Sequence, residues 1–216
     1  MGLTIASTMF FLLLLSVLPS TSFSSPLAKR ASPPNVPAYI TNYAPIVYLY
    51  SSDPYRPADI SAQLVHTQPE INYAAISIGP LNLDNLNSSL TNYTGSSIYL
   101  TSTDDITSNP SWLQGVTPNN SGETEGATSC AIIVNDHGAG LVDVFYMYFY
   151  AFDYGGEYFA HVIGDHVGDW EHNMIRFQNE TPVALWYSQH SNGEAFTYEA
   201  VEKYSDGFRV SVVTLC

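Results

Sequence analysis

The apolar positions of this chain fall in short runs rich in tyrosine, threonine and β-branched residues, which is typical of β-strands. Strands are predicted at residues 46–50, 97–102, 128–134, 141–152, 169–177, 183–189 and 196–201. Apolar side chains occupy both faces of the run 141–152, as expected for a strand inside a packed sheet. The pattern predicts a mainly β fold, specifically a β-sandwich.

One short helix is predicted near the N-terminus of the domain, over residues 57–66. Pro57 suits a first helical turn, and Ile60 and Leu64 lie four residues apart on one face. Residues 67–125 are rich in Asn, Ser, Thr, Gly and Pro, so apart from the strand at 97–102 we expect long loops there.

The start of the chain predicts a secretory protein. Residues 9–18 form an apolar run of ten, the length of a signal-peptide core, and Lys29-Arg30 forms a dibasic processing site. We therefore expect a signal peptide at 1–22, a short propeptide at 23–30 and one domain at 31–216. Four sequons, at Asn87, Asn92, Asn119 and Asn179, agree with a secreted or vacuolar glycoprotein. No later run is long enough for a transmembrane helix.

The charge of the chain limits its partners. Six Lys and Arg face twenty Asp and Glu, a formal net charge of −14. Nucleic acids and anionic lipids need a basic surface, so both are poor partners, and we expect no nucleic-acid partner. Cations are favoured. Two cysteines, Cys130 and Cys216, allow at most one disulfide, and their spacing supports no thiolate metal site. Nothing in the sequence sets the oligomeric state.

The segment 165–172, Asp-His-Val-Gly-Asp-Trp-Glu-His, concentrates ionisable side chains in a chain with few of them. On a strand, Asp169 and Glu171 project from one face roughly 6–7 Å apart, and His166 precedes them at a turn. Two adjacent carboxylates are unfavourable unless a cation lies between them or one is protonated. The segment therefore predicts a cation site or an acid–base pair.

Four residues in or near this segment are considered as further members of the site. Asp153 follows the apolar strand and is either a turn former or a ligand at the sheet rim. Trp170 should lie in the core, on the face away from Asp169. We expect His172 to be a hydrogen-bonded histidine beneath the site, and His190, which ends the next strand, to reach the same rim.

Other polar residues have simpler interpretations. Asp143, in the middle of a strand, is expected to be an edge or paired acid, and His137 a turn residue. Carboxylates with at most one imidazole favour Ca²⁺ or Mg²⁺ over Zn²⁺, which prefers Cys or several His ligands.

Much of the domain resembles the fungal vacuolar protein sorting-associated protein 62 family. The resemblance runs from about residue 37 to 208 and rests on the segments 43–49, 53–60, 130–138, 166–173 and 187–190. The family name implies a trafficking role, and passage through the secretory pathway agrees with the predicted signal peptide.

A more distant resemblance, to the secreted necrosis- and ethylene-inducing-peptide-like proteins, bears on mechanism. Their motif Gly-His-Arg-His-Asp-Trp-Glu corresponds to residues 165–171, matching at His166, Asp169, Trp170 and Glu171, and their preceding strand and acid correspond to 146–153. That resemblance implies a β-sandwich and a divalent cation held by Asp153, His166, Asp169 and Glu171, used to bind membrane glycolipid. The chain departs from the motif at Val167 and Gly168, so the toxic activity of that family is not expected here.

The resemblance to the sorting family fades after residue 208, and members of that family continue beyond it. We therefore expect the chain to be truncated at its C-terminus, with the true partner of Cys130 beyond Cys216. A truncated sheet would expose an unpaired edge.

Three functions remain open. The first is a binding module that recognises a glycan or lipid headgroup through the cation. The second is a glycoside hydrolase-like enzyme that uses Asp169 and Glu171 as its carboxyl pair. The third is a structural or trafficking protein without a metal site. The substitution Glu171→Gln separates them, through loss of cation binding, loss of turnover alone, or no effect.

Overall fold

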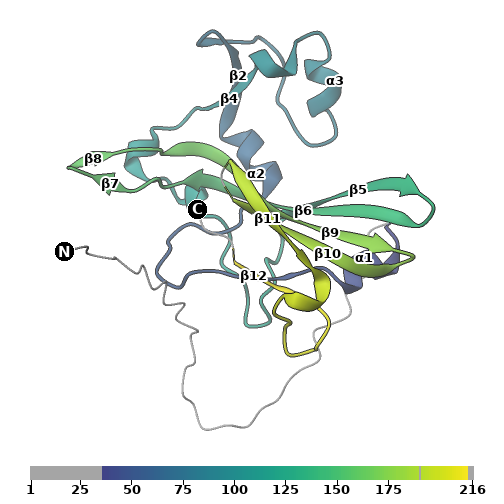
Figure 1. Ribbon diagram of the computed structural model, residues 1–216. Helices are drawn as coiled ribbons and strands as arrows, with labels where there is room; N and C mark the ends of the chain where they lie inside the picture. The colour runs from purple at the N-terminus through teal and green to yellow at the C-terminus, as the bar shows by residue number, and fades with distance from the viewer. Residues whose placement is uncertain (1–35, 190, 214–216) are drawn as a thin grey trace, which may run out of the picture.

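The computed structural model describes residues 36–189 and 191–213. The predicted signal peptide and propeptide, His190 and Cys216 lie outside the described residues. The described chain is mainly β, as the sequence predicted, with one large sheet, three small sheets and a few short helices (Figure 1).

The largest sheet has five antiparallel strands in the order β11-β10-β9-β6-β5. These strands are β5 Cys130–Gly138, β6 Leu141–Asp153, β9 His166–Gln178, β10 Thr181–Gln189 and β11 Asn192–Thr197. β5, β6, β9 and β10 were predicted from the sequence, although β9 begins three residues earlier than expected and includes His166 as its first residue. The predicted strand at 196–201 overlaps β11 only at Phe196 and Thr197, because β11 begins at Asn192 and residues Tyr198–Ala200 form the 3-10 helix η4.

The inner face of the large sheet carries the main core. Alternate residues of β6 and β9 point into it, and the fully buried members include Tyr146, Tyr150, Ile175 and Phe177. Burying side chains of this size contributes about 1.5–3 kcal/mol each. The buried hydroxyl of Tyr146 donates to the carbonyl of Ile40 at 2.7 Å, so the core also ties the sheet to the N-terminal segment.

A thin second layer covers this face. It consists of α1 Ala38–Asn42 and a parallel pair of strands, β1 Ile46–Tyr48 and β12 Ser211–Val213, whose register places Val47 opposite Val212. Ile40, Val47 and Val212 belong to the same core as β6 and β9. The two layers have the packing of a sandwich, with one layer much smaller than the other.

A second sheet occupies the region that the sequence predicted to be loops. Its strands are β2 Thr67–Ile71, β3 Ala74–Ala75 and β4 Tyr99–Ser102, in the order β3-β2-β4. Only β4 was predicted. β2 was missed because its sequence, Thr-Gln-Pro-Glu-Ile, contains a proline and little apolar character. The rest of this region holds α3 Leu86–Leu90 and the 3-10 helices η1 Gly95–Ser97, η2 Ile106–Ser108 and η3 Ser111–Gln114.

The predicted helix over 57–66 is present but shorter, as α2 Ile60–Val65. Asp59 ends the preceding loop as its N-cap, and one carboxylate oxygen accepts from the backbone N–H of Ala62 at 3.2 Å. Pro57 is not helical and forms an isolated bridge to Tyr150 of β6. The short helices α1 and α3 were not predicted.

A two-stranded hairpin, β7 Glu157–Tyr158 and β8 His161–Val162, extends the chain between β6 and β9. Figure 1 shows it projecting from the body of the molecule, beyond the end of the large sheet. Its base is narrow, because a Cβ on Gly155 would lie 2.1 Å from the carbonyl oxygen of Ile163. Only glycine permits this close approach of the two chains.

Candidate functional site

The end of β6 and the start of β9 bring two of the four predicted ligands into contact. Asp153 is the last residue of β6 and lies opposite His166, the first residue of β9. Their nearest atoms, Asp153 Oδ2 and His166 Nε2, are 3.2 Å apart. The same imidazole places Nδ1 3.2 Å from the carbonyl oxygen of Gly168.

These two contacts constrain the hydrogens of His166. A carbonyl oxygen can only accept, so Nδ1 must be the donor to Gly168. In the neutral imidazole Nε2 is then an acceptor, and it faces the carboxylate of Asp153, which in its ionised form can only accept as well. This arrangement requires a proton or a cation between Nε2 and Oδ2.

Asp169 and Glu171 lie on the inner face of the large sheet. Asp169 is opposite Tyr150 and Glu171 is opposite Tyr148, both on the core face of β6. Partial burial, together with the charges of Asp169 and Asp153, raises the pKa of Glu171 to about 7. Glu171 therefore sits in a position that disfavours its ionised form at neutral pH.

The pKa of Asp153 also depends on its burial and on the neighbouring charges. Burial raises its pKa, the charge of His166 opposes that shift, and the charges of Asp169, Asp165 and Asp53 add to it. Asp53 belongs to a loop distant in sequence, which is held against β6 because the N–H of Ala58 donates to the carbonyl of Phe149 at 2.7 Å. Nothing in the sequence around Asp53 indicates its proximity to the site.

Asp165 has a structural role beside the site. Its Oδ1 accepts from the backbone N–H of Gly155 at 2.9 Å, which closes the base of the hairpin between β6 and β9. Its charge and that of Asp53 also act on Tyr55, whose pKa is raised by burial and by these two acids. Asp53, Tyr55 and Asp165 thus form the surroundings of the Asp153–His166 pair.

The four predicted ligands are not gathered into a finished coordination shell. Within residues 36–189 and 191–213, no three His, Cys, Asp or Glu side chains are grouped so that they could hold a metal ion. In the register, the facing residues Asp153 and His166 lie three residues along each strand from the facing residues Tyr150 and Asp169. Gly168, with φ +78°, interrupts the alternation between them.

The remaining residues near the motif have other surroundings. Trp170 was predicted to be in the core but is 40% exposed, with its ring 4.9 Å from that of Phe149 on the outer face. His172 shares that outer face, next to the ring of Phe145, and burial lowers its pKa. Alternation along β9 places it on the face opposite Asp169 and Glu171.

Asp143 is a paired acid, as predicted. Its two carboxylate oxygens accept from Nε and Nη2 of Arg176 at 2.7 and 2.8 Å. His137 was expected in a turn but lies in β5, with Nε2 2.9 Å from Asp143 Oδ2. Hydrogen bonding to Arg176 lowers the pKa of Asp143.

One buried polar residue adjoins Glu171 along β9. Asn173 is 2% exposed, and its Oδ1 accepts from the hydroxyl of Tyr148 at 2.7 Å. Its Nδ2 has no hydrogen-bond partner among the described residues. A buried donor without a partner is unfavourable by about 1–3 kcal/mol. Asn173 is therefore a polar residue next to Glu171 whose amide group lacks a hydrogen-bond acceptor in the described part of the chain.

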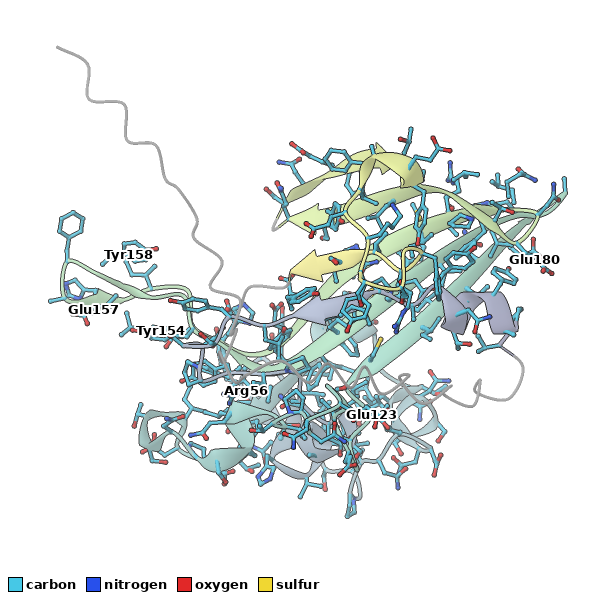
Figure 2. All side chains as sticks on the ribbon, turned by 90° about the horizontal axis from the view of Figure 1, so that it is seen from below. Arg56, Glu123, Tyr154, Glu157, Tyr158 and Glu180 are labelled. Carbon is cyan, nitrogen blue, oxygen red and sulfur yellow. The ribbon has the colours of Figure 1, made fainter. Side chains whose placement is uncertain are left out.

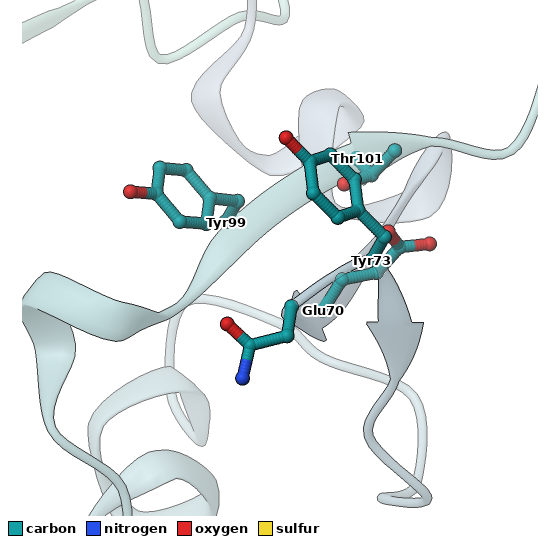
Figure 3. A pocket seen from close by; sticks show the side chains of 5 residues that line it. Glu70, Tyr73, Tyr99 and Thr101 are labelled. Atoms are coloured by element: carbon teal, nitrogen blue, oxygen red, sulfur yellow. The ribbon is translucent and has the colours of Figure 1, made fainter.

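A separate shallow pocket lies on the small sheet, away from these acids. Glu70, Asn72, Tyr73, Tyr99 and Thr101 line it, and Figure 3 shows the side chains of Tyr73 and Tyr99 beside it. None of the residues predicted from the sequence to form a site contributes to it. Among the described helices, none is long and apolar enough to cross a membrane.

Comparisons with known proteins give a consistent result. The chain matches the family described as vacuolar protein sorting-associated protein 62 over residues 24–214. It is 36% identical over 201 residues to the Saccharomyces cerevisiae protein TDA6, which is named for vacuolar protein sorting, covering 87% of this chain and 43% of that protein. It is 34% identical over 182 residues to the Saccharomyces cerevisiae vacuolar protein sorting-associated protein 62, covering 78% of this chain and 39% of that protein. The chain thus spans about two fifths of the length of these relatives. No solved structure matches it.

Proposed function

This chain belongs to the vacuolar protein sorting-associated protein 62 family, and on that premise we propose that it is a cation-dependent binding module of the secretory pathway, secreted or vacuolar. Asp153, His166, Asp169 and Glu171 would hold one divalent cation, Ca²⁺ or Mg²⁺ in preference to Zn²⁺. Through that ion the module would recognise a glycan or a lipid headgroup.

The single observation that carries this proposal is the contact between His166 and Asp153. Nε2 and Oδ2 face each other at 3.2 Å while Nδ1 is committed to the carbonyl of Gly168. A divalent cation would satisfy both acceptors at once. It would also offset the repulsion that raises the pKa values of Asp153 and Glu171.

The donor set agrees with a hard cation. Three carboxylates and one imidazole supply mainly oxygen ligands, which suit Ca²⁺ and Mg²⁺ better than Zn²⁺. Asp169 and Glu171 would turn toward the Asp153–His166 pair when the ion binds, and Gly168 between them gives the backbone the freedom to permit this. Hydroxyl or phosphate oxygens of a ligand could then coordinate the cation at its open positions.

Thermal unfolding tests the cation site. With Ca²⁺ or Mg²⁺ at a hundred times its dissociation constant, the folded protein gains about 2.7 kcal/mol relative to EDTA. For a domain of this size the midpoint should rise by roughly 5–10 °C. Asp169→Asn should remove the shift, whereas Asp84→Asn, the same change at an exposed acid in another part of the chain, should keep it. Equal shifts in both variants would contradict the proposal.

A second candidate function is favoured by one observation. Glu171, with a pKa of about 7, is suited to donate a proton near neutral pH beside the carboxylate of Asp169. A glycoside hydrolase would use such a pair. Glu171→Gln distinguishes the two functions: loss of turnover on a glycoside with cation binding intact favours the enzyme, and loss of cation binding favours the module.

A further inference from the structure

We propose that the β7–β8 hairpin is a membrane-contacting finger that inserts its apolar tip into the interface of an electrically neutral lipid bilayer. The inference goes beyond the cation site and does not depend on it. It rests on the exposure, arrangement and turn chemistry of residues 154–163.

The hairpin exposes an unusual set of apolar side chains. Phe159, at the turn, is 99% exposed, and the flanking residues Tyr158, Val162 and Ile163 are 58%, 55% and 57% exposed. Figure 2 shows Tyr158 and Glu157 at one end of the molecule, with Glu180 at the other. Contiguous exposed apolar surface of this kind marks an interaction site in a water-soluble domain.

The arrangement of these side chains favours a bilayer over a protein groove. Paired residues of an antiparallel ribbon share a face, so Tyr158 and His161 lie on one side and Glu157 and Val162 on the other. Apolar groups therefore occupy both faces of the ribbon as well as its tip. A groove on a partner protein would cover one face, whereas a bilayer interface surrounds the whole tip.

Charge selects the kind of bilayer. The hairpin carries one acid, Glu157, and one imidazole, His161, and the chain as a whole has a net charge of −14. An anionic surface would repel it. Tyrosine and phenylalanine beside aliphatic residues are suited to the boundary between headgroups and acyl chains.

The turn holds Phe159 outward at the expense of backbone strain. Phe159 and Ala160 have φ of +52° and +62°, a turn that ordinarily selects Asn and Gly. Two other turns of the chain, Asn72-Tyr73 and Asn179-Glu180, adopt the same φ pattern and place Asn first. Asparagine adopts the left-handed region at a lower energetic cost than phenylalanine. The position thus carries an aromatic side chain where turn stability alone would favour Asn.

The substitution Phe159→Asn therefore tests membrane binding without a loss of stability. Phe159→Asn should leave the thermal midpoint unchanged or raise it, because it relieves the turn. The matched control is Tyr73→Asn, which replaces another 99% exposed aromatic residue with φ +63° outside the hairpin. Both variants should fold, so a difference between them reports on the finger.

The measurement is co-sedimentation of the purified protein with phosphatidylcholine vesicles, in EDTA and in calcium. We expect the parent and Tyr73→Asn to bind equally in both buffers. Phe159→Asn should bind at least about tenfold more weakly, since burying a phenylalanine side chain changes partition by ten- to a hundredfold. Equal binding of all three proteins, no binding by the parent, or binding that depends on calcium but not on Phe159 would overturn the proposal. The last result would leave the cation site standing.

Discussion

His166 shows how individual residues combine at this site. Its ring is oriented by the carbonyl of Gly168, so its second nitrogen must face Asp153. The sequence alone grouped His166 with Asp169 and Glu171 because they are close along the chain. It could not show that His166 lies within β9, or that Gly168 would interrupt the alternation of faces, since both depend on the backbone conformation at one glycine.

The pH dependence of stability follows from Glu171. In the fold its pKa is about 7, above the ordinary value of 4.5, so between these values the folded protein binds more protons than the unfolded chain. Without cation, stability should therefore rise as pH falls from about 7 toward 4.5. Asp153 and Asp53 act in the same direction, and His172, whose pKa is lowered, acts against them.

Glu171→Gln isolates this contribution. The variant should be more stable than the parent at pH 7.5 in EDTA, and the advantage should vanish near pH 4.5. Urea unfolding across this range measures it, with Glu194→Gln on the exposed face of β11 as the control of equal charge change. A constant difference between Glu171→Gln and the parent at all pH values would contradict the assigned origin of the effect.

The Asp143–Arg176 pair makes a separate prediction. Asp143 is 5% exposed and accepts two hydrogen bonds from Arg176. Asp143→Ala should destabilise the protein by about 1.5–3 kcal/mol, the range for hydrogen bonds to charged groups. Arg176→Met keeps the aliphatic stem but leaves Asp143 buried without its cation, so its loss should be at least as large. Denaturant titration of both variants measures the losses, and values below about 0.5 kcal/mol would show that the pair is dispensable.

At the scale of elements, apolar runs predicted the central strands of the large sheet. β6 buries apolar side chains along most of its length and β9 buries Ile175 and Phe177, whereas β10 buries only Leu185 and the edge strands β5 and β11 have no buried residue. The small sheet was missed because β2 contains a proline and β3 has only two residues. Trp170 was misplaced because the apolar face of β9 is the one that carries Ile175 and Phe177, and alternation puts Trp170 on the opposite face.

Asp59 links two elements and so tests how α2 is positioned. Its side chain caps α2 at Ala62, and its Oδ1 also accepts from the backbone N–H of Thr128 at 3.0 Å, just before β5. Asp59→Ala should cost about 1–2 kcal/mol, the upper part of the range for an N-cap, because two segments lose an acceptor. Asp59→Asn should lose less. Hydrogen exchange at Ala62 and Thr128 locates the effect, and equal protection in Asp59→Ala and the parent would contradict the role given to Asp59.

The described part of the chain is mainly β, with two unequal layers and the candidate site residues at one end of the large sheet. The core lies between the large sheet and the thin layer of α1, β1 and β12, and Asp153 contacts His166 where β6 ends and β9 begins. The β7–β8 hairpin extends from the same end of the large sheet (Figure 1). The strong negative charge of the chain agrees with a cation as the link to a ligand.

The most direct test of the cation site is equilibrium dialysis of the purified protein against calcium, followed by metal analysis. The account predicts saturable binding of one ion per chain, absent in His166→Ala and Asp169→Asn and retained in Asp84→Asn. Binding that does not saturate, or that is equal in all four proteins, would show only diffuse attraction to an acidic surface and would contradict a site at Asp153, His166, Asp169 and Glu171.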